Sequence, residues 1–199
     1  MERDLGRIAA FTDGVMAVAI TLLVLNVEVP HLEPGEGLGD ALWHEVLPSL
    51  SAFALAFALV GRFWVLHHNL FERLHSFDRT LMTLNLLFLA LIVLMPFSAD
   101  LYDVYTQRPA AAAVLGGTLG AAALVNGLMT THVVRQGFVH KHLHEETRAG
   151  IPVGRGLTVI FFLSVPAAFL SVHLAEALWV STVVLRYPLR RLGRRTSSA

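Results

Sequence analysis

Apolar stretches, each close to the length of a membrane-crossing helix, limit most strongly what this chain can fold into. A helix needs about twenty apolar residues to cross the hydrocarbon of a bilayer. Polar segments divide the chain into six such stretches, at about 8–27, 46–66, 81–97, 110–134, 157–172 and 174–189. Hydrophobic residues make up 55% of the chain and charged residues 15%, which is too apolar for a soluble domain. The sequence therefore predicts an all-α integral membrane protein with six transmembrane helices.

Two of these stretches have distinctive features. The fourth is rich in glycine and alanine, from Ala110 through Gly116 and Gly120, and small residues let helices approach each other closely in lipid. We therefore expect it to be buried among its neighbours. The fifth and sixth are separated only by His173 and its neighbours, which predicts a tight hairpin of short or tilted helices.

The distribution of basic residues predicts the orientation in the membrane. Cytoplasmic loops collect Lys and Arg, and external loops do not. With both termini in the cytoplasm, every Lys and Arg except Arg108 falls on the cytoplasmic side. The loop after the first stretch instead carries only acidic charges, from Glu28 to Glu45. We expect a multi-pass plasma-membrane protein with cytoplasmic N- and C-termini, a single domain over 1–192 and a short basic cytoplasmic tail over 193–199.

Several classes of protein are disfavoured by what the chain contains. Asp13 interrupts the first apolar stretch and no small-residue cleavage site follows Leu25, so we do not expect a cleaved signal peptide. The sequence has no cysteine, which excludes disulfides, thiolate metal sites and cysteine nucleophiles. The formal net charge is zero, so nothing points to a nucleic-acid partner.

The first apolar stretch contains two features that need an explanation. Asp13 is an ionisable residue within it, and such residues are functional candidates by default. Alternatively, its carboxylate caps the amino end of the membrane-embedded helix. Beyond it, Val18, Leu22 and Leu25 recur at helical spacing beside the hydroxyl of Thr21. Periodicity alone favours packing of this aliphatic ladder against lipid or other helices over a pore.

Polar residues gather at the cytoplasmic ends of the next two stretches. They lie at the same membrane depth as Arg7 and Asp13, so they can form an interhelical network of hydrogen bonds and salt bridges or an ordinary interfacial belt. The members nearest the membrane are Trp64, His67, His68 and Asn85.

A cluster of three histidines, His140, His142 and His144, invites a metal assignment. On a helix only His140 and His144 share a face, and Glu145 is the one further ligand beside them. We therefore expect a solvated loop, with no metal and no cofactor.

The segment from Arg7 to Pro30 resembles the first helix of the transmembrane protein 175 family. The signature of that helix is an arginine, three variable residues and then Phe-Ser-Asp; Arg7, Phe11 and Asp13 match it, and Thr12 replaces the serine with another hydroxyl. Residues of the following two stretches also look familial, and the resemblance covers the amino-terminal half: Trp64, His67, His68, Phe71, Asp78, Asn85 and the 95–97 segment.

The resemblance implies a modestly potassium-selective channel that is not an enzyme. Its single-repeat prokaryotic members assemble as homotetramers in the bilayer, and four copies of the first helix line the pore for K⁺. Carried over, the hydrophobic constriction falls on Val18, Leu22 and Leu25, with Thr21 facing the pore. The signature residues and the Trp64, His67, His68 and Asn85 network would brace the helices near the cytoplasmic mouth. Val18 departs from the isoleucine or leucine often found there, which can move the narrowest point.

Three other functions stay open. A proton-coupled secondary transporter would use Asp13 and nearby histidines as titrating groups, although no inverted repeat is visible. A membrane-embedded metalloenzyme would use the chain's histidines, which are irregularly spaced for a metal site. A non-conducting assembly factor is the third.

Overall fold

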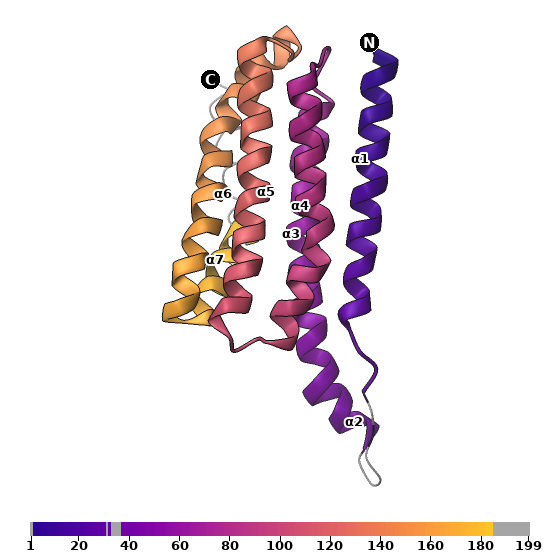
Figure 1. Cartoon of the computed structure of the whole chain (residues 1–199), viewed down its shortest axis with the longest axis vertical. Helices are drawn as coiled ribbons and strands as arrows, with labels where there is room; N and C mark the ends of the chain where they lie inside the picture. Colours follow the sequence, from indigo (N-terminus) through magenta and orange to yellow (C-terminus); the bar gives the residue numbers. More distant parts are fainter. Residues whose placement is uncertain (1, 31, 33–36, 185–199) are drawn as a thin grey trace, which may run out of the picture.

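The computed structural model describes residues 2–30, 32 and 37–184 and forms a bundle of long helices (Figure 1). Among these residues the one β pairing is an isolated bridge between Leu74 and Val139. The α-helices in chain order are α1 (Glu2–Leu22), α2 (Leu38–Ala41), α3 (Leu47–Phe71), α4 (Arg79–Val104), α5 (Pro109–Gln136), α6 (His144–Leu170) and α7 (Val172–Val184).

Five segments are long and apolar enough to cross a membrane: Leu5–Asn26, Leu38–Phe71, Arg79–Val104, Pro109–Gln136 and Lys141–Leu170. They confirm the all-α membrane class. The sixth predicted stretch corresponds to α7, a helix of 13 residues that are mostly apolar. The remaining residues of that stretch, 185–189, and the predicted tail, 193–199, lie outside the described residues.

The second span begins eight residues earlier than predicted. A π-helical turn, Leu42–Val46, joins α2 to α3, so the helix runs on from Leu38. Pro48 explains the wide turn, because proline cannot donate a hydrogen bond to the preceding turn and its ring collides with the carbonyl four residues earlier. This extension projects beyond the ends of the other helices (Figure 1).

The fifth span also begins earlier, at His144 rather than 157. Its first turns are polar, with Glu145 and Glu146 near the positive end of the helix dipole. It ends at Leu170, where Ser171 adopts an extended conformation before α7 begins. The predicted break therefore exists, two residues ahead of His173.

The small residues of α5 let α6 approach it closely, as the composition predicted. A Cβ atom added at Gly116 would lie 2.4 Å from the Ser164 hydroxyl, and one added at Gly120 would lie 2.9 Å from the Phe162 ring. Within the described residues, α5 is also the most buried span, with 61% of its most apolar window inside the protein.

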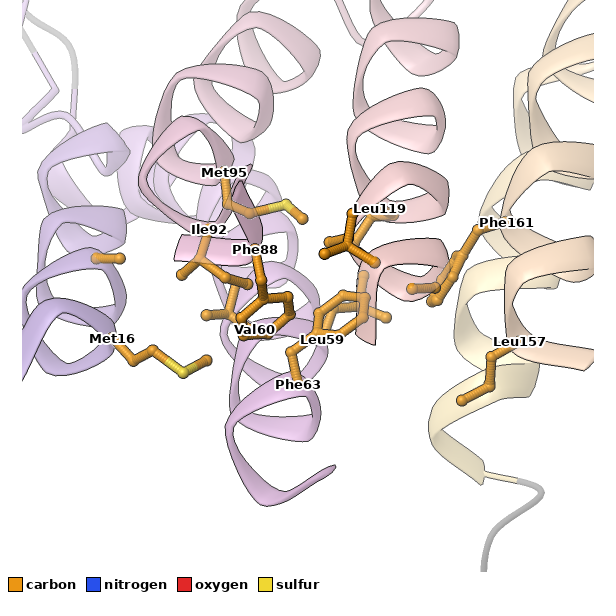
Figure 2. Close-up of a cluster of buried hydrophobic side chains, with 14 of the residues drawn as sticks. Met16, Leu59, Val60, Phe63, Phe88, Ile92, Met95, Leu119, Leu157 and Phe161 are labelled. Carbon is orange, nitrogen blue, oxygen red and sulfur yellow. The ribbon is translucent and has the colours of Figure 1, made fainter. Parts of the chain in front are cut away.

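A core of apolar side chains joins α1, α3, α4, α5 and α6 (Figure 2). Phe63 of α3 lies at its centre, with its ring centroid 6.1 Å from that of Phe88 on α4 and 6.0 Å from that of Phe161 on α6. Met16 is the fully buried contribution of α1. The core thus fixes one face of α1 against the bundle.

Candidate functional site

The first helix, α1, has two faces with opposite environments. Thr12, Met16 and Ala19 of α1 are buried, as is Leu23 in the 3-10 turn Leu23–Asn26 that continues the helix, and α1 packs through this face on α3 and α4. The predicted ladder lies on the other side. Val18 is 58% exposed, Leu22 41% and Leu25 72%, although all three are aliphatic. The spacing of apolar residues did not separate these faces, because both are apolar.

The exposed face of α1 is hollowed into an apolar groove of about 480 Å³. Val18 and Leu22 line it together with Phe11 and Gly14, and Val93 of α4 forms part of its wall. Thr21 is also exposed, and its hydroxyl donates a 2.8 Å hydrogen bond to the Val18 carbonyl in the turn below. That bond uses the hydroxyl proton, so the Thr21 oxygen retains lone pairs that can face a cation.

On the buried side, three predicted site residues from three helices form one chain of hydrogen bonds. The Asn85 amide donates to the Thr12 hydroxyl at 3.0 Å, and its carbonyl oxygen lies 2.8 Å from Nε2 of His67. An amide oxygen only accepts, so His67 carries its proton on Nε2. The His67 ring is stacked between Phe71 and Phe88, with centroid distances of 4.1 and 5.3 Å. This buried triad ties α1 to α3 and α4.

Asp13 takes part in a second, more exposed link. The Trp64 indole donates a 2.9 Å hydrogen bond to its carboxylate. The Trp64 ring stacks on His68, whose Nε2 lies 3.1 Å from the carboxylate of Glu72. Because α1 begins at Glu2, Asp13 lies well inside the helix, where backbone N–H groups are already paired. The helix-cap alternative is therefore wrong.

The remaining signature residues, Arg7 and Phe11, lie on exposed positions of α1. Both line a surface pocket of about 530 Å³ with Phe77, Met82 and Asn85. This pocket lies over the buried triad. The predicted network residues thus lie around the amino-terminal half of α1. Thr12, His67 and Asn85 form one hydrogen-bonded group and Asp13 and Trp64 another. Arg7 and Phe11 line the pocket beside them.

Two partners of the interhelical links were missed from the sequence. Asp78 caps α4 by accepting a 2.8 Å hydrogen bond from the Leu81 N–H, and it lies 2.9 Å from Nε2 of His132 on α5. Partial burial favours a higher pKa for Asp78, but these hydrogen bonds outweigh it and hold the pKa below its usual value. The one sequence feature that could have indicated this link is His132 itself, a polar residue within the fourth apolar stretch.

The second missed partner is Glu146. Its carboxylate accepts a 2.8 Å charged hydrogen bond from Arg73, which also donates to the Thr147 hydroxyl at 3.2 Å. Glu146 lies outside the predicted fifth stretch, so hydropathy assigned it no position in the bundle. The pair links the α3–α4 connection to α6.

The three clustered histidines lie in and beside the α5–α6 connection. His140 and His142 have ring centroids 5.8 Å apart, whereas His144 faces the Val134 carbonyl. Over residues 2–30, 32 and 37–184, no group of three or more His, Cys, Asp or Glu side chains has the geometry to hold a metal ion.

Comparison with known proteins identifies the family. The sequence model described as "Endosomal/lysosomal potassium channel TMEM175" matches residues 7–96, which include most of α1, all of α3 and most of α4. A protein of Streptomyces collinus named as a potassium channel is 36% identical over 174 residues, covering 85% of this chain and 82% of the relative. The chain belongs to the TMEM175 family. The resemblance inferred from the α1 signature is thereby confirmed, and this family consists of channels rather than enzymes.

Other TMEM175 proteins extend the comparison. The crystal structure of a lysosomal potassium-selective channel TMEM175 homologue from Chamaesiphon minutus superposes with a TM-score of 0.82 at 31% identity, covering 92% of this chain and 96% of that one. The endosomal/lysosomal proton channel TMEM175 of Gallus gallus is 26% identical over 69% of this chain. This chain spans only 26% of that longer relative.

Proposed function

We propose that this protein is a modestly selective potassium channel whose pore is lined by the exposed face of α1. The observation that carries this proposal is the division of α1 into two faces. The signature residues Thr12 and Asp13 hold the helix on α3 and α4, while the ladder of Val18, Leu22 and Leu25 faces away from its own chain. Membership of the TMEM175 family supports the same function.

The proposed assembly is a homotetramer. One chain cannot enclose a pore, because the groove beside Val18 and Leu22 is open along α1. Rotational symmetry about an axis beside this face would bring identical ladders opposite one another.

Within such a pore, each rung of the ladder forms a ring of aliphatic side chains. Val18, Leu22 and Leu25 are about one helical turn apart, so successive rings would be separated by about 5 Å. A K⁺ ion crossing them loses part of its water shell, and K⁺ releases water more readily than the smaller Na⁺. The oxygen atoms of Thr21, one residue before the Leu22 ring, would replace some of that water.

The proposed topology has six transmembrane helices in one domain over 1–192, with both termini in the cytoplasm of a plasma-membrane protein. The connections after α3 and α5 lie at the end of the bundle that holds the N-terminus, whereas the α4–α5 connection lies at the opposite end (Figure 1). The first two carry Arg73 and Lys141, and the third carries Arg108. This distribution supports a cytoplasmic N-terminal end.

At the opposite end of the bundle, acidic residues line a surface pocket of about 470 Å³. The pocket lies where the chain leaves the proposed pore helix toward α2. Glu28 and Glu45 belong to it, together with Asp100 and Asp103 of α4. Their negative potential would raise the local concentration of cations at the outer mouth. The proposed function needs the bilayer and permeant K⁺ and uses no cofactor.

Proton permeation is a second candidate, favoured by the name of the Gallus gallus relative and by the position of Asp13 within a span. A proton-coupled secondary transporter is less well supported, because the family comprises channels. Currents that persist without a counter-substrate distinguish a channel from a transporter, and a reversal potential that follows the proton gradient identifies proton permeation.

The proposal is tested by K⁺ flux into liposomes that contain the purified protein. Val18→Asn and Leu22→Asn place polar groups in the ladder and are expected to change K⁺ flux and the K⁺/Na⁺ ratio. Val159→Asn on α6 is the matched control, since Val159 is 55% exposed and Val18 is 58% exposed. Flux that responds to Val159→Asn but not to the two ladder variants would place the pore elsewhere.

A further inference from the structure

A cavity of about 310 Å³ lies between α3, α5 and α6, away from the proposed pore helix. All its lining residues within the described chain come from those helices and from Arg73 in the connection after α3. The volume is at the lower end of the range of about 300–1,000 Å³ that is usual for ligand pockets. Neither the proposed permeation pathway nor the buried triad uses this cavity.

The lining of the cavity changes in character along the bundle. Arg73 and Glu146 lie at the end nearest the N-terminus, and Phe63, Leu66 and Leu157 lie deeper in the apolar part. Glu146 and Leu157 are eleven residues apart on α6, which corresponds to about 16 Å along a helix axis. A charged mouth above an apolar interior matches the way a lipid spans the headgroup and acyl regions of one leaflet.

The charges at the mouth restrict the headgroup. Arg73 and Glu146 are 2.8 Å apart, and the Glu146 side chain is 67% exposed. A phosphate can approach the guanidinium and an ammonium can approach the carboxylate. A purely anionic headgroup would meet Glu146, and a choline group has no N–H to donate. The pair therefore matches a headgroup that carries both a phosphate and a primary amine.

Inside the cavity one polar group lacks a partner. Asn126 lines the wall, is 9% exposed, and its Nδ2 finds no hydrogen-bond acceptor among the residues that the structure describes. Burial of an unpaired amide donor is unfavourable. The Nδ2 atom is enclosed in the wall, so an ester or phosphate oxygen of a ligand can supply the missing acceptor once the side chain rotates toward the cavity.

Space for the ligand is left by glycine residues of α6. Gly150 and Gly154 both line the cavity, and a Cβ atom added at Gly150 would meet nothing within 4 Å. A larger side chain at Gly150 would therefore fill the cavity without a backbone clash.

We propose that this cavity is a binding site for an ethanolamine phospholipid, with the phosphate at Arg73, the ammonium at Glu146 and an acyl chain between Phe63 and Leu157. The site is independent of the proposed ion pathway. It would hold a lipid of the leaflet on the side of the N-terminus.

Native mass spectrometry of the purified full-length protein tests this proposal. Ethanolamine, choline and glycerol phospholipids are offered at equal concentration, and the ethanolamine lipid is expected to be retained about fivefold more than either of the others. Gly150→Leu is expected to abolish that preference, and Glu146→Gln to reduce it. Gly156→Leu is the matched control, because it lies on the same helix, its added Cβ also meets nothing within 4 Å, and it does not line the cavity.

A second variant guards against a folding defect in Gly150→Leu. Asn126→Leu removes the unpaired donor while keeping the branched shape of the side chain, so it is expected to lower ethanolamine-lipid binding without lowering the melting temperature. Equal retention of the three lipids, or retention unchanged in both Gly150→Leu and Asn126→Leu, would overturn the proposal. Complete displacement of the lipid by soluble phosphoethanolamine would overturn its acyl-chain part.

Discussion

The indole Nε1–H of Trp64 points at the carboxylate of Asp13, 2.9 Å away, so a residue near the end of α3 holds a charged residue in the middle of α1. Fifty-one positions separate the two residues in the chain. The bond lies directly beside the buried Thr12–Asn85–His67 triad. Neighbouring residues of α1 are thus held by two different partners on α3 and α4, which fixes the rotation of α1 about its own axis.

Trp64→Phe is expected to destabilise the protein by about 1.5 kcal/mol, the lower end of the range for a hydrogen bond to a charged group, because this bond is exposed. The phenyl ring can still stack on His68, so the loss reports mainly the missing N–H donor. Thermal unfolding of Trp64→Phe, Asp13→Asn and the double variant checks this. A double variant whose loss equals the sum of the two single losses would show that the residues are not coupled.

Thr12→Val is expected to cost about 1–3 kcal/mol, because it leaves the Asn85 amide buried without its acceptor. Thr12→Ser keeps the hydroxyl and is the control, with a loss well below that of Thr12→Val. The measurement is the melting temperature of each variant in the same detergent. Equal melting temperatures for the two variants would mean that packing, not the hydrogen bond, decides at this position.

Gly116→Ala is expected to separate α5 from α6 and to destabilise the bundle by about 1–3 kcal/mol, as overpacking usually does. The new Cβ would lie 2.4 Å from the Ser164 hydroxyl, which also accepts a 2.8 Å bond from the Trp179 indole. Gly117→Ala is the matched neighbour, since its added Cβ meets nothing within 4 Å. If thermal unfolding shows the same change for both alanine variants, close α5–α6 contact is not needed at Gly116.

The hydrogen bonds of Asp78 with the Leu81 N–H and with His132 predict a dependence of stability on pH. The pKa of Asp78 is lowered in the folded protein, so its contribution is fully present above the unfolded value of about 3.9 and is lost as the pH falls below it. Asp78→Asn can still cap α4 but does not titrate. Between pH 6 and about pH 3, the melting temperature of the wild type should fall more than that of Asp78→Asn. Parallel curves would exclude a role for this carboxylate.

The sequence predicted the features of this fold that depend on hydropathy and failed where helices continue outside the apolar region. The cores of the five long spans were located, because apolar length alone identifies them. The starts of the second and fifth spans, at Leu38 and His144, could not be found in the same way. Their first turns are polar, and a helix that leaves the bilayer carries no hydropathy signal.

For the candidate site, the sequence predicted the depth of the polar residues in the membrane but not which of them form hydrogen bonds with each other. Trp64, His67, Asn85 and Asp13 were expected at one level, and they do lie together. Depth does not say that Asn85 bonds to Thr12 while Trp64 bonds to Asp13, since that depends on the rotation of each helix about its axis. The same limit hid the His132 partner of Asp78, whereas Glu146 was missed because it lies outside the predicted fifth stretch.

The separation of α1 into a buried and an exposed face also predicts what happens when normal and variant subunits are made in the same cell. Asn85 and Trp64, which hold Thr12 and Asp13, belong to the same polypeptide as α1, so a subunit with an altered ladder retains these contacts. In the proposed tetramer, such a subunit would assemble with normal ones. It would place its altered side chain in a ring that all four subunits form around the pore. Substitutions at Val18 or Leu22 are therefore expected to act dominantly on co-expression, whereas substitutions that break the buried triad would act recessively, because the subunit is lost before assembly.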